Sequence, residues 1–247
     1  MEGDFMERNL TQGKIGKSIL LFSIPMILGN LLQQFYNIVD TYIVGKYIGS
    51  NALAAVGSSY TLMTFLTSII IGLCMGSGIL FSMYFGAKKY EKMKISFFVS
   101  FVSIGILSIV LEIVCFLLLK YILIWLQIPQ VIYNQTAKYL QIIFIGIIFT
   151  FIYNYFAAML RALGNSKIPL IFLGIATIVN VVLDIIFVLY VHLGVAGAAY
   201  ATIISQAISA FGLALYVLLL KKEILPQRKH YIFDQHIFKK LKDYSLM

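Results

Sequence analysis

Six long apolar runs dominate this sequence, and each is close to the roughly 20 residues that a helix needs to cross a bilayer. We expect spanning helices at 18–44, 51–85, 95–119, 135–160, 168–190 and 195–220. The chain is 61% hydrophobic and 12% charged, whereas soluble domains have about 45–50% apolar and about 25% charged residues. A soluble core could not absorb this much apolar surface. The runs therefore predict an all-α membrane protein, a bundle of six transmembrane helices.

Lysine and arginine are distributed unevenly over the connections between these runs. If the amino terminus faces the cytoplasm, sixteen of the nineteen basic residues lie on that side, and only Lys46, Lys120 and Lys138 lie on the other. Because basic loops stay inside, we expect a multi-pass protein of the cell membrane with both termini in the cytoplasm. Topology and anionic lipid headgroups then account for the net charge of +9. Nucleic-acid binding is disfavoured, since the basic residues lie in short loops without interleaved aromatic residues.

The sequence has no motif of a known catalytic chemistry. It contains no H-E-x-x-H, no G-x-S-x-G and no Walker loop, and His192, His230 and His236 lie in loops without metal-ligand spacing. Cys74 and Cys115 fall inside expected helices, where small buried hydrophobic residues are the simpler interpretation than a disulfide. We therefore expect no enzymatic activity and no organic cofactor.

Polar side chains in three of the expected spans share one face of each helix. At about 100° per residue, these stripes are Asn30, Gln33, Asn37, Asp40 and Thr41; Thr177, Asn180 and Asp184; and Thr202, Ser205, Gln206 and Ser209. In lipid such faces must turn toward one another or toward a water-filled cavity. Interhelical hydrogen bonding explains Ser and Thr, but a carboxylate at bilayer depth costs on the order of 2.5–3.5 kcal/mol. Asp40 and Asp184 therefore predict a functional site.

Several blocks of the sequence, taken in order, resemble one transporter family. They are IPMILGNLLQQFYNIVDTYIVGKYIGSNALAAVG, YFGAKKYEKMK, MLRALGNSKIPL and NVVLDIIFV followed by HLGVAGAAYATIISQ. Together, from about residue 13 to residue 222, they resemble the amino-terminal half of a multidrug and toxic compound extrusion (MATE) transporter. The resemblance implies that the six helices form one lobe of a twelve-helix, two-lobe transporter.

The resemblance also implies roles for residues in the polar stripes. Asp40, Asn180, Asp184 and Thr202 match a cation-coupling site, and they would be the metal ligands if the coupling ion is Na⁺ rather than H⁺. Two carboxylates in one cavity stay ionised only if they share a hard cation through oxygen ligands; otherwise one of them takes up a proton. Residues that could border this network or the substrate cavity are Gln33, Tyr36, Asn37, Tyr139 and Asn154.

The function implied by the resemblance is multidrug efflux, the antiport of amphipathic or cationic organic compounds against H⁺ or Na⁺. Two alternatives stay open. A lipid or oligosaccharide flippase of the same superfamily should lack the acid pair and have a more basic cavity. A non-transporting membrane partner subunit should tolerate Asn at both Asp40 and Asp184.

The expected domain organisation has three parts. Residues 1–17 form a cytoplasmic amphipathic segment, 18–220 the six-helix lobe, and 221–247 a basic cytoplasmic linker toward a missing second lobe. The last residues, HIFKKLKDYSLM, resemble the basic approach to the first span. We therefore expect a truncated transporter, whose partner would be the missing carboxyl-terminal lobe or a second copy of the chain.

Overall fold

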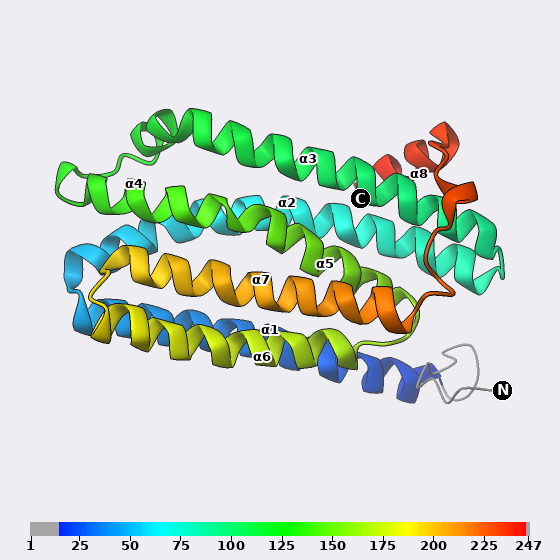
Figure 1. Ribbon diagram of the computed structural model, residues 1–247, viewed down its shortest axis with the longest axis horizontal. Coiled ribbons are helices and arrows are strands. Elements are labelled where there is room, and N and C mark those ends of the chain that lie inside the picture. The colour runs from blue at the N-terminus through cyan, green and yellow to red at the C-terminus, as the bar shows by residue number, and fades with distance from the viewer. Residues whose placement is uncertain (1–14, 246–247) are drawn as a thin grey trace.

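The computed structural model describes residues 15–245, and over this range the protein is a bundle of long helices without strands (Figure 1). Most of the expected 1–17 segment lies outside the described residues. The helices are α1 (Ile15–Tyr47), α2 (Ser50–Gly86), α3 (Tyr90–Trp125), α4 (Gln130–Phe144), α5 (Gly146–Ala162), α6 (Lys167–Asp184), α7 (Val195–Leu220) and α8 (Gln235–Ser245). A π-helical segment, η1 (Ile185–Tyr190), follows α6, and a short 3₁₀ turn, η2 (Arg228–His230), precedes α8. The predicted all-α, six-span lobe is confirmed, with α4 and α5 together, and α6 and η1 together, each forming one span.

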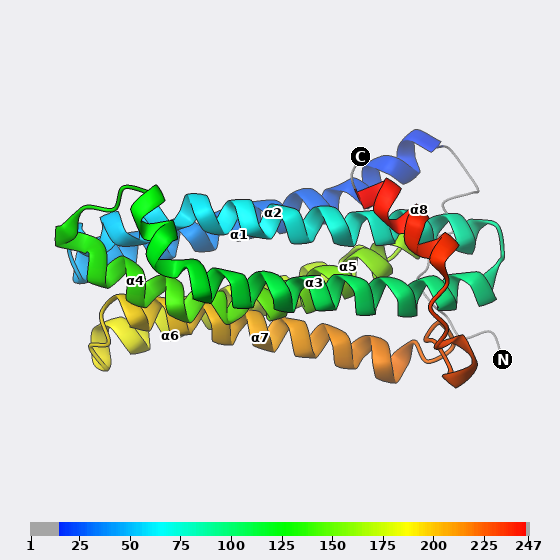
Figure 2. The same cartoon turned by 90° about the horizontal axis from the view of Figure 1, so that it is seen from above.

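Four of these spans are long and apolar enough to cross a bilayer by themselves, namely α2, α3, α6 with η1, and α7, and the bent pair α4 and α5 adds a fifth. The described part of α1 carries the polar stripe and is not in this set. Even so, α1 has 33 residues, which corresponds to about 50 Å of helix, and it packs against α6 and α2. The bundle is accordingly elongated, with every long helix running nearly along its axis (Figure 2).

The fourth span is not the single helix that the sequence predicted. It begins at Gln130, breaks at Ile145 and bends there by 42°. Gly146 lies at the bend against α7, where a Cβ atom would be 2.8 Å from Oε1 of Gln206 and 3.2 Å from Cγ2 of Ile203. A side chain at this position would therefore require Gln206 to move and Ile203 to shift slightly, and glycine lets α5 pass α7 without either adjustment.

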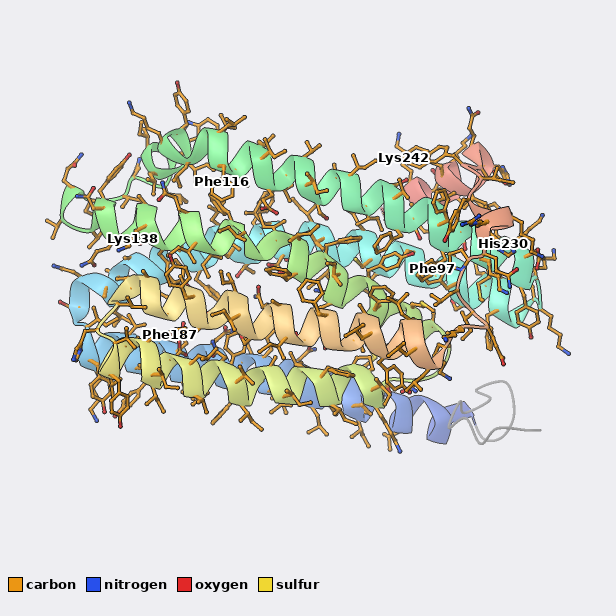
Figure 3. All side chains as sticks on the ribbon, viewed as in Figure 1. Phe97, Phe116, Lys138, Phe187, His230 and Lys242 are labelled. Carbon is orange, nitrogen blue, oxygen red and sulfur yellow. The ribbon has the colours of Figure 1, made fainter. Side chains whose placement is uncertain are left out.

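The fifth span also departs from a uniform helix. Its regular part ends at Asp184, and the next six residues are π-helical. Phe187 in this segment faces Gly197 of α7, where a Cβ atom would lie 3.1 Å from the backbone carbon and oxygen of Phe187. Figure 3 shows Phe187 near the end of the bundle opposite His230. The π-helical turn thus directly follows the carboxylate that the sequence singled out, at a position where such turns often mark functional sites.

Aromatic side chains hold α5 against α3 inside the half of the bundle toward His230 (Figure 3). Tyr155 is fully buried, and its hydroxyl donates to the carbonyl oxygen of Phe97 at 2.7 Å and lies 2.8 Å from Oγ of Ser100. The rings of Phe97, Phe101 and Phe151 surround it, with centroids 5.2–5.7 Å from its own. The buried hydroxyl is therefore paired, as an apolar interior requires.

The segment after α7 returns to the bundle and packs on α2 and α3. Nε2 of His230 lies 3.0 Å from Oε2 of Glu91, and Nζ of Lys229 lies 3.0 Å from the same oxygen. Because Nδ1 of His230 accepts the backbone N–H of Gln227 at 2.9 Å, Nε2 is the donor to Glu91. In α8, Ile237 and Leu241 are buried against the bundle. We call this end, with the α2–α3 and α5–α6 connections, the basic end.

Candidate cation site

Asp40 and Asp184 are brought to the same level by the register of α1 and α6. The two helices run in the same direction, and a Cβ atom at Gly29 would lie 3.5 Å from Cδ2 of Leu173. Asp40 follows Gly29 by eleven residues, and Asp184 follows Leu173 by eleven. Both carboxylates are thus about 16 Å along the axis from that contact. The register therefore brings Asp40 to the level of Asp184, whereas Asn30, Gln33 and Thr41 of the predicted α1 stripe are exposed.

The two carboxyl groups face each other inside the protein. Asp40 is 6% exposed and Asp184 is 0% exposed, and their side chains lie within hydrogen-bonding reach of one another. Each is the charged neighbour of the other, and no lysine or arginine of the described residues acts on either. Two ionised groups in this arrangement would repel strongly in a low-dielectric interior. The pair is therefore suited to hold a proton or a metal cation between its members.

Most oxygens of this pair have no hydrogen-bond partner. Within residues 15–245, Oδ1 of Asp40 and both carboxylate oxygens of Asp184 are buried without a hydrogen bond. The same is true of Oδ1 and Nδ2 of Asn180. Buried polar atoms are nearly always paired in native proteins. A cluster of unpaired carboxylate and amide oxygens is therefore the donor set that a hard cation, bound through oxygen, would satisfy.

Asn180 and Thr202 lie at the level of the pair. Asn180 precedes Asp184 by one turn of α6 and is 1% exposed. α7 runs antiparallel to α6, and with Phe187 against Gly197 the register places Thr202 between the levels of Asn180 and Asp184. Thr202 is 8% exposed. All four predicted coupling residues are thus buried in the region between α1, α6 and α7.

Two tyrosines complete the surroundings of the pair. Tyr36 on α1 and Tyr139 on α4 both lie within electrostatic range of Asp40 and Asp184, and Tyr139 is 8% exposed. Sequence reasoning missed Tyr60 on α2, which acts electrostatically on Tyr36. Tyr60 lies in a stretch of α2 without any acid, so no local signal pointed to it.

The remaining predicted border residues do not join this cluster. Asn154 donates to the carbonyl oxygen of Thr150 in its own helix, and the adjacent Tyr153 bonds to Pro169 at the start of α6, the opposite end from Asp184. Asn37 donates to Gln34 on the surface of α1 at 3.1 Å, and Gln33 is exposed. Asn154 of α5 thus lies beside the start of α6, and Gln33 and Asn37 lie on the surface of α1, so their part in a substrate cavity stays a prediction.

Known proteins match this chain over most of its length. The MatE family model matches residues 25–186. The Bacillus subtilis (strain 168) protein called "Probable multidrug resistance protein YpnP" is 36% identical over 218 residues, which cover 88% of this chain and 48% of that protein. "Multidrug export protein MepA" of Staphylococcus haemolyticus is 30% identical over 207 residues, covering 83% and 45%.

Solved structures share the fold at lower identity. A multidrug resistance MATE family transporter in an outward-facing conformation superposes with a TM-score of 0.87 at 23% identity, over 95% of this chain and 53% of that one. A MOP superfamily transporter from Pyrococcus furiosus superposes with a TM-score of 0.88 at 24% identity, over 96% and 52%. The chain thus spans about half the length of the relatives that it matches.

Proposed function

The chain belongs to the MatE family, and on this premise we propose that it forms the amino-terminal lobe of a transporter that exports amphipathic or cationic organic compounds in exchange for H⁺ or Na⁺. One observation carries the proposal. Oδ1 of Asp40 and both carboxylate oxygens of Asp184 are buried without a hydrogen-bond partner, an arrangement that a bound coupling ion would stabilise. The multidrug names of the relatives agree with an export function.

The chain's own residues would hold the ion in one of two ways. For Na⁺, carboxylate oxygens of Asp40 and Asp184 supply negative charge, and Oδ1 of Asn180 and the hydroxyl of Thr202 supply neutral oxygen ligands. For H⁺, a single proton shared by the two carboxyl groups removes their repulsion and provides the missing donor. Either ion turns a repulsive contact between α1 and α6 into an attractive one.

Ion binding would act on the helix that borders the drug path. The face of α1 away from α6 is exposed and apolar, with Leu31, Phe35 and Ile38 each more than half exposed. Pro25 interrupts the hydrogen bonding of the same helix about 22 Å from Asp40, which provides a place to bend. We propose that drug and ion favour different positions of α1 and so weaken each other's binding, a reciprocal coupling. A carboxyl-terminal lobe, or a second copy, would cover this face.

The experiment compares single substitutions in the protein as its gene encodes it, in membrane vesicles loaded with a fluorescent cationic dye. Asp40→Asn and Asp184→Asn should each abolish dye efflux driven by a pH or Na⁺ jump while insertion is unchanged. Glu112→Gln is the matched control, since Glu112 is also an acid in a span but is partly exposed on α3. Normal efflux in either Asn variant would refute the site, and loss in all three would show that the effect is not specific to the pair.

We further propose that the protein lies in the cell membrane with the basic end in the cytoplasm. Cysteines introduced at exposed lysines test this: in intact cells a membrane-impermeant maleimide should label Lys138→Cys and spare Lys239→Cys. The native cysteines are buried and should contribute little background. The reverse labelling pattern would invert the proposed topology.

A further inference from the structure

A groove of about 540 Å³ opens at the basic end, where the end of α2 and the start of α3 meet the end of α7. Its apolar wall is formed by Phe85 and Tyr90 on one side and by Leu219 and Leu220 on the other. Leu219 and Leu220 are 62% and 58% exposed, so this wall continues into the outer surface of α7. The volume is within the range of about 300–1,000 Å³ that is typical of ligand pockets.

The charged residues of the groove are predominantly cationic. Lys94 from α3 and Lys221 and Lys222 from the end of α7 line it, together with one acid, Glu223. The other acid at this corner, Glu91, is already engaged by Lys229 and His230. Lys94 is half-buried and Lys222 is exposed. The groove therefore carries a positive charge at the level where the apolar spans give way to polar connections.

Lysine side chains beside an apolar wall suit a ligand that combines an anionic group with a hydrocarbon chain. A free phosphate would leave the wall uncovered, and a neutral lipid would leave the lysines without a counter-charge. We propose that this groove binds one anionic phospholipid, with its phosphate between Lys94 and Lys222 and an acyl chain along Leu219 and Leu220. Basic residues at a membrane surface attract such lipids, but here they sit in a defined hollow. The bound lipid would brace the point at which α7 passes into the 221–234 connection.

Retention of lipid by the purified protein, measured by native mass spectrometry, tests this proposal. The protein as its gene encodes it is exchanged into detergent with equal amounts of phosphatidylglycerol and phosphatidylcholine. We expect one phosphatidylglycerol to be retained in preference to phosphatidylcholine. The double variant Lys94→Gln, Lys222→Gln should lose about 20- to 30-fold in affinity, since each lysine near a headgroup contributes roughly fivefold.

Two controls make the result decisive. Lys239→Gln, Lys242→Gln removes the same charge from exposed positions on α8 at the same end and should retain phosphatidylglycerol normally. Excess inorganic phosphate should not displace the lipid, because it cannot occupy the apolar wall. Equal retention of the two lipids, equal loss in both double variants, or full displacement by phosphate would each overturn the proposal. Thermal unfolding of each variant confirms that it is folded, so that a folding defect is not mistaken for lost binding.

Discussion

Gly197→Ala tests whether the close contact between α7 and the π-helical turn sets the geometry beside Asp184. The new methyl group would lie 3.1 Å from the backbone carbon, the backbone oxygen and Cβ of Phe187. Backbone atoms cannot rotate away as the end of a side chain can, so we expect an overpacking cost of about 1–3 kcal/mol. Replacing a helical glycine by alanine stabilises the folded protein by about 0.5–1 kcal/mol. The net loss is then about 1–2 kcal/mol.

The two cysteines provide the assay. Cys74 and Cys115 are 1% and 4% exposed, so a thiol-reactive fluorogenic dye should report global unfolding of the purified protein in detergent. For a chain of this size, each kcal/mol of lost stability lowers the midpoint of thermal unfolding by about 2–4 °C. The midpoint for Gly197→Ala should therefore fall by about 2–8 °C.

Gly57→Ala is the matched control, because a Cβ atom at this exposed position of α2 would meet nothing within 4 Å. Its midpoint should be unchanged or slightly higher. If Gly197→Ala were as stable as Gly57→Ala, the close approach of Phe187 would not be what holds η1 in place. The contact of α7 with η1 would then not be what positions Asp184.

Three further outcomes are expected. Tyr155→Phe removes the buried bonds to Phe97 and Ser100 and should cost about 1 kcal/mol, seen as a lower midpoint in the same dye assay; an unchanged midpoint would mean that these bonds add nothing net. Saturating Na⁺, or H⁺ at lower pH, should raise the midpoint of thermal unfolding of the wild type, by the equivalent of about 2.7 kcal/mol at a hundredfold excess over Kd. The same ion should not raise the midpoint of Asp184→Asn. An equal rise in both proteins would exclude the pair as the binding site. The pKa of Glu91 lies below its ordinary value because Lys229, and then His230, donate to its carboxylate. This contact should therefore stabilise the segment after α7 at pH values above the ordinary pKa range of a carboxyl group. The stabilisation should be lost as the pH falls through and below that range. At neutral pH, Glu91→Gln should accelerate tryptic cleavage at Lys229 relative to Asp243→Asn, and equal rates would show that the contact does not restrain the linker.

The candidate ion site is formed entirely by residues of this chain. α1 contributes Asp40, α6 contributes Asn180 and Asp184, and α7 contributes Thr202. Ion binding can therefore be measured on this chain separately from transport, which we propose requires a partner lobe. If a cation raises the midpoint of thermal unfolding but the chain does not transport, the ion site is intact and the chain lacks its partner lobe.

Sequence alone was sufficient for the spans and for the burial of Asp40 and Asp184, but Asn30, Gln33 and Thr41 of the predicted α1 stripe are exposed. The apolar runs placed the ends of the six spans within six residues of the observed helix ends, because the bilayer imposes a minimum apolar length on any helix that crosses it. Helical periodicity placed Asp40 and Asp184 on polar faces, because a charge in lipid must turn inward. Neither signal depends on how the helices are arranged around one another.

Tertiary structure decided which inward faces meet. Asp40 and Asp184 lie at one level because Gly29 packs against Leu173, and Tyr153, next to Asn154, bonds to the other end of α6 at Pro169. The bend at Ile145 and the π-helical turn after Asp184 lie beside close approaches of α7 at Gly146 and Gly197. Such contacts join residues that are distant in sequence. The presence of a glycine in the sequence does not indicate which helix packs against it. The periodicity of a single helix defines a face but not its register against a neighbour, and register is a property of the packed bundle.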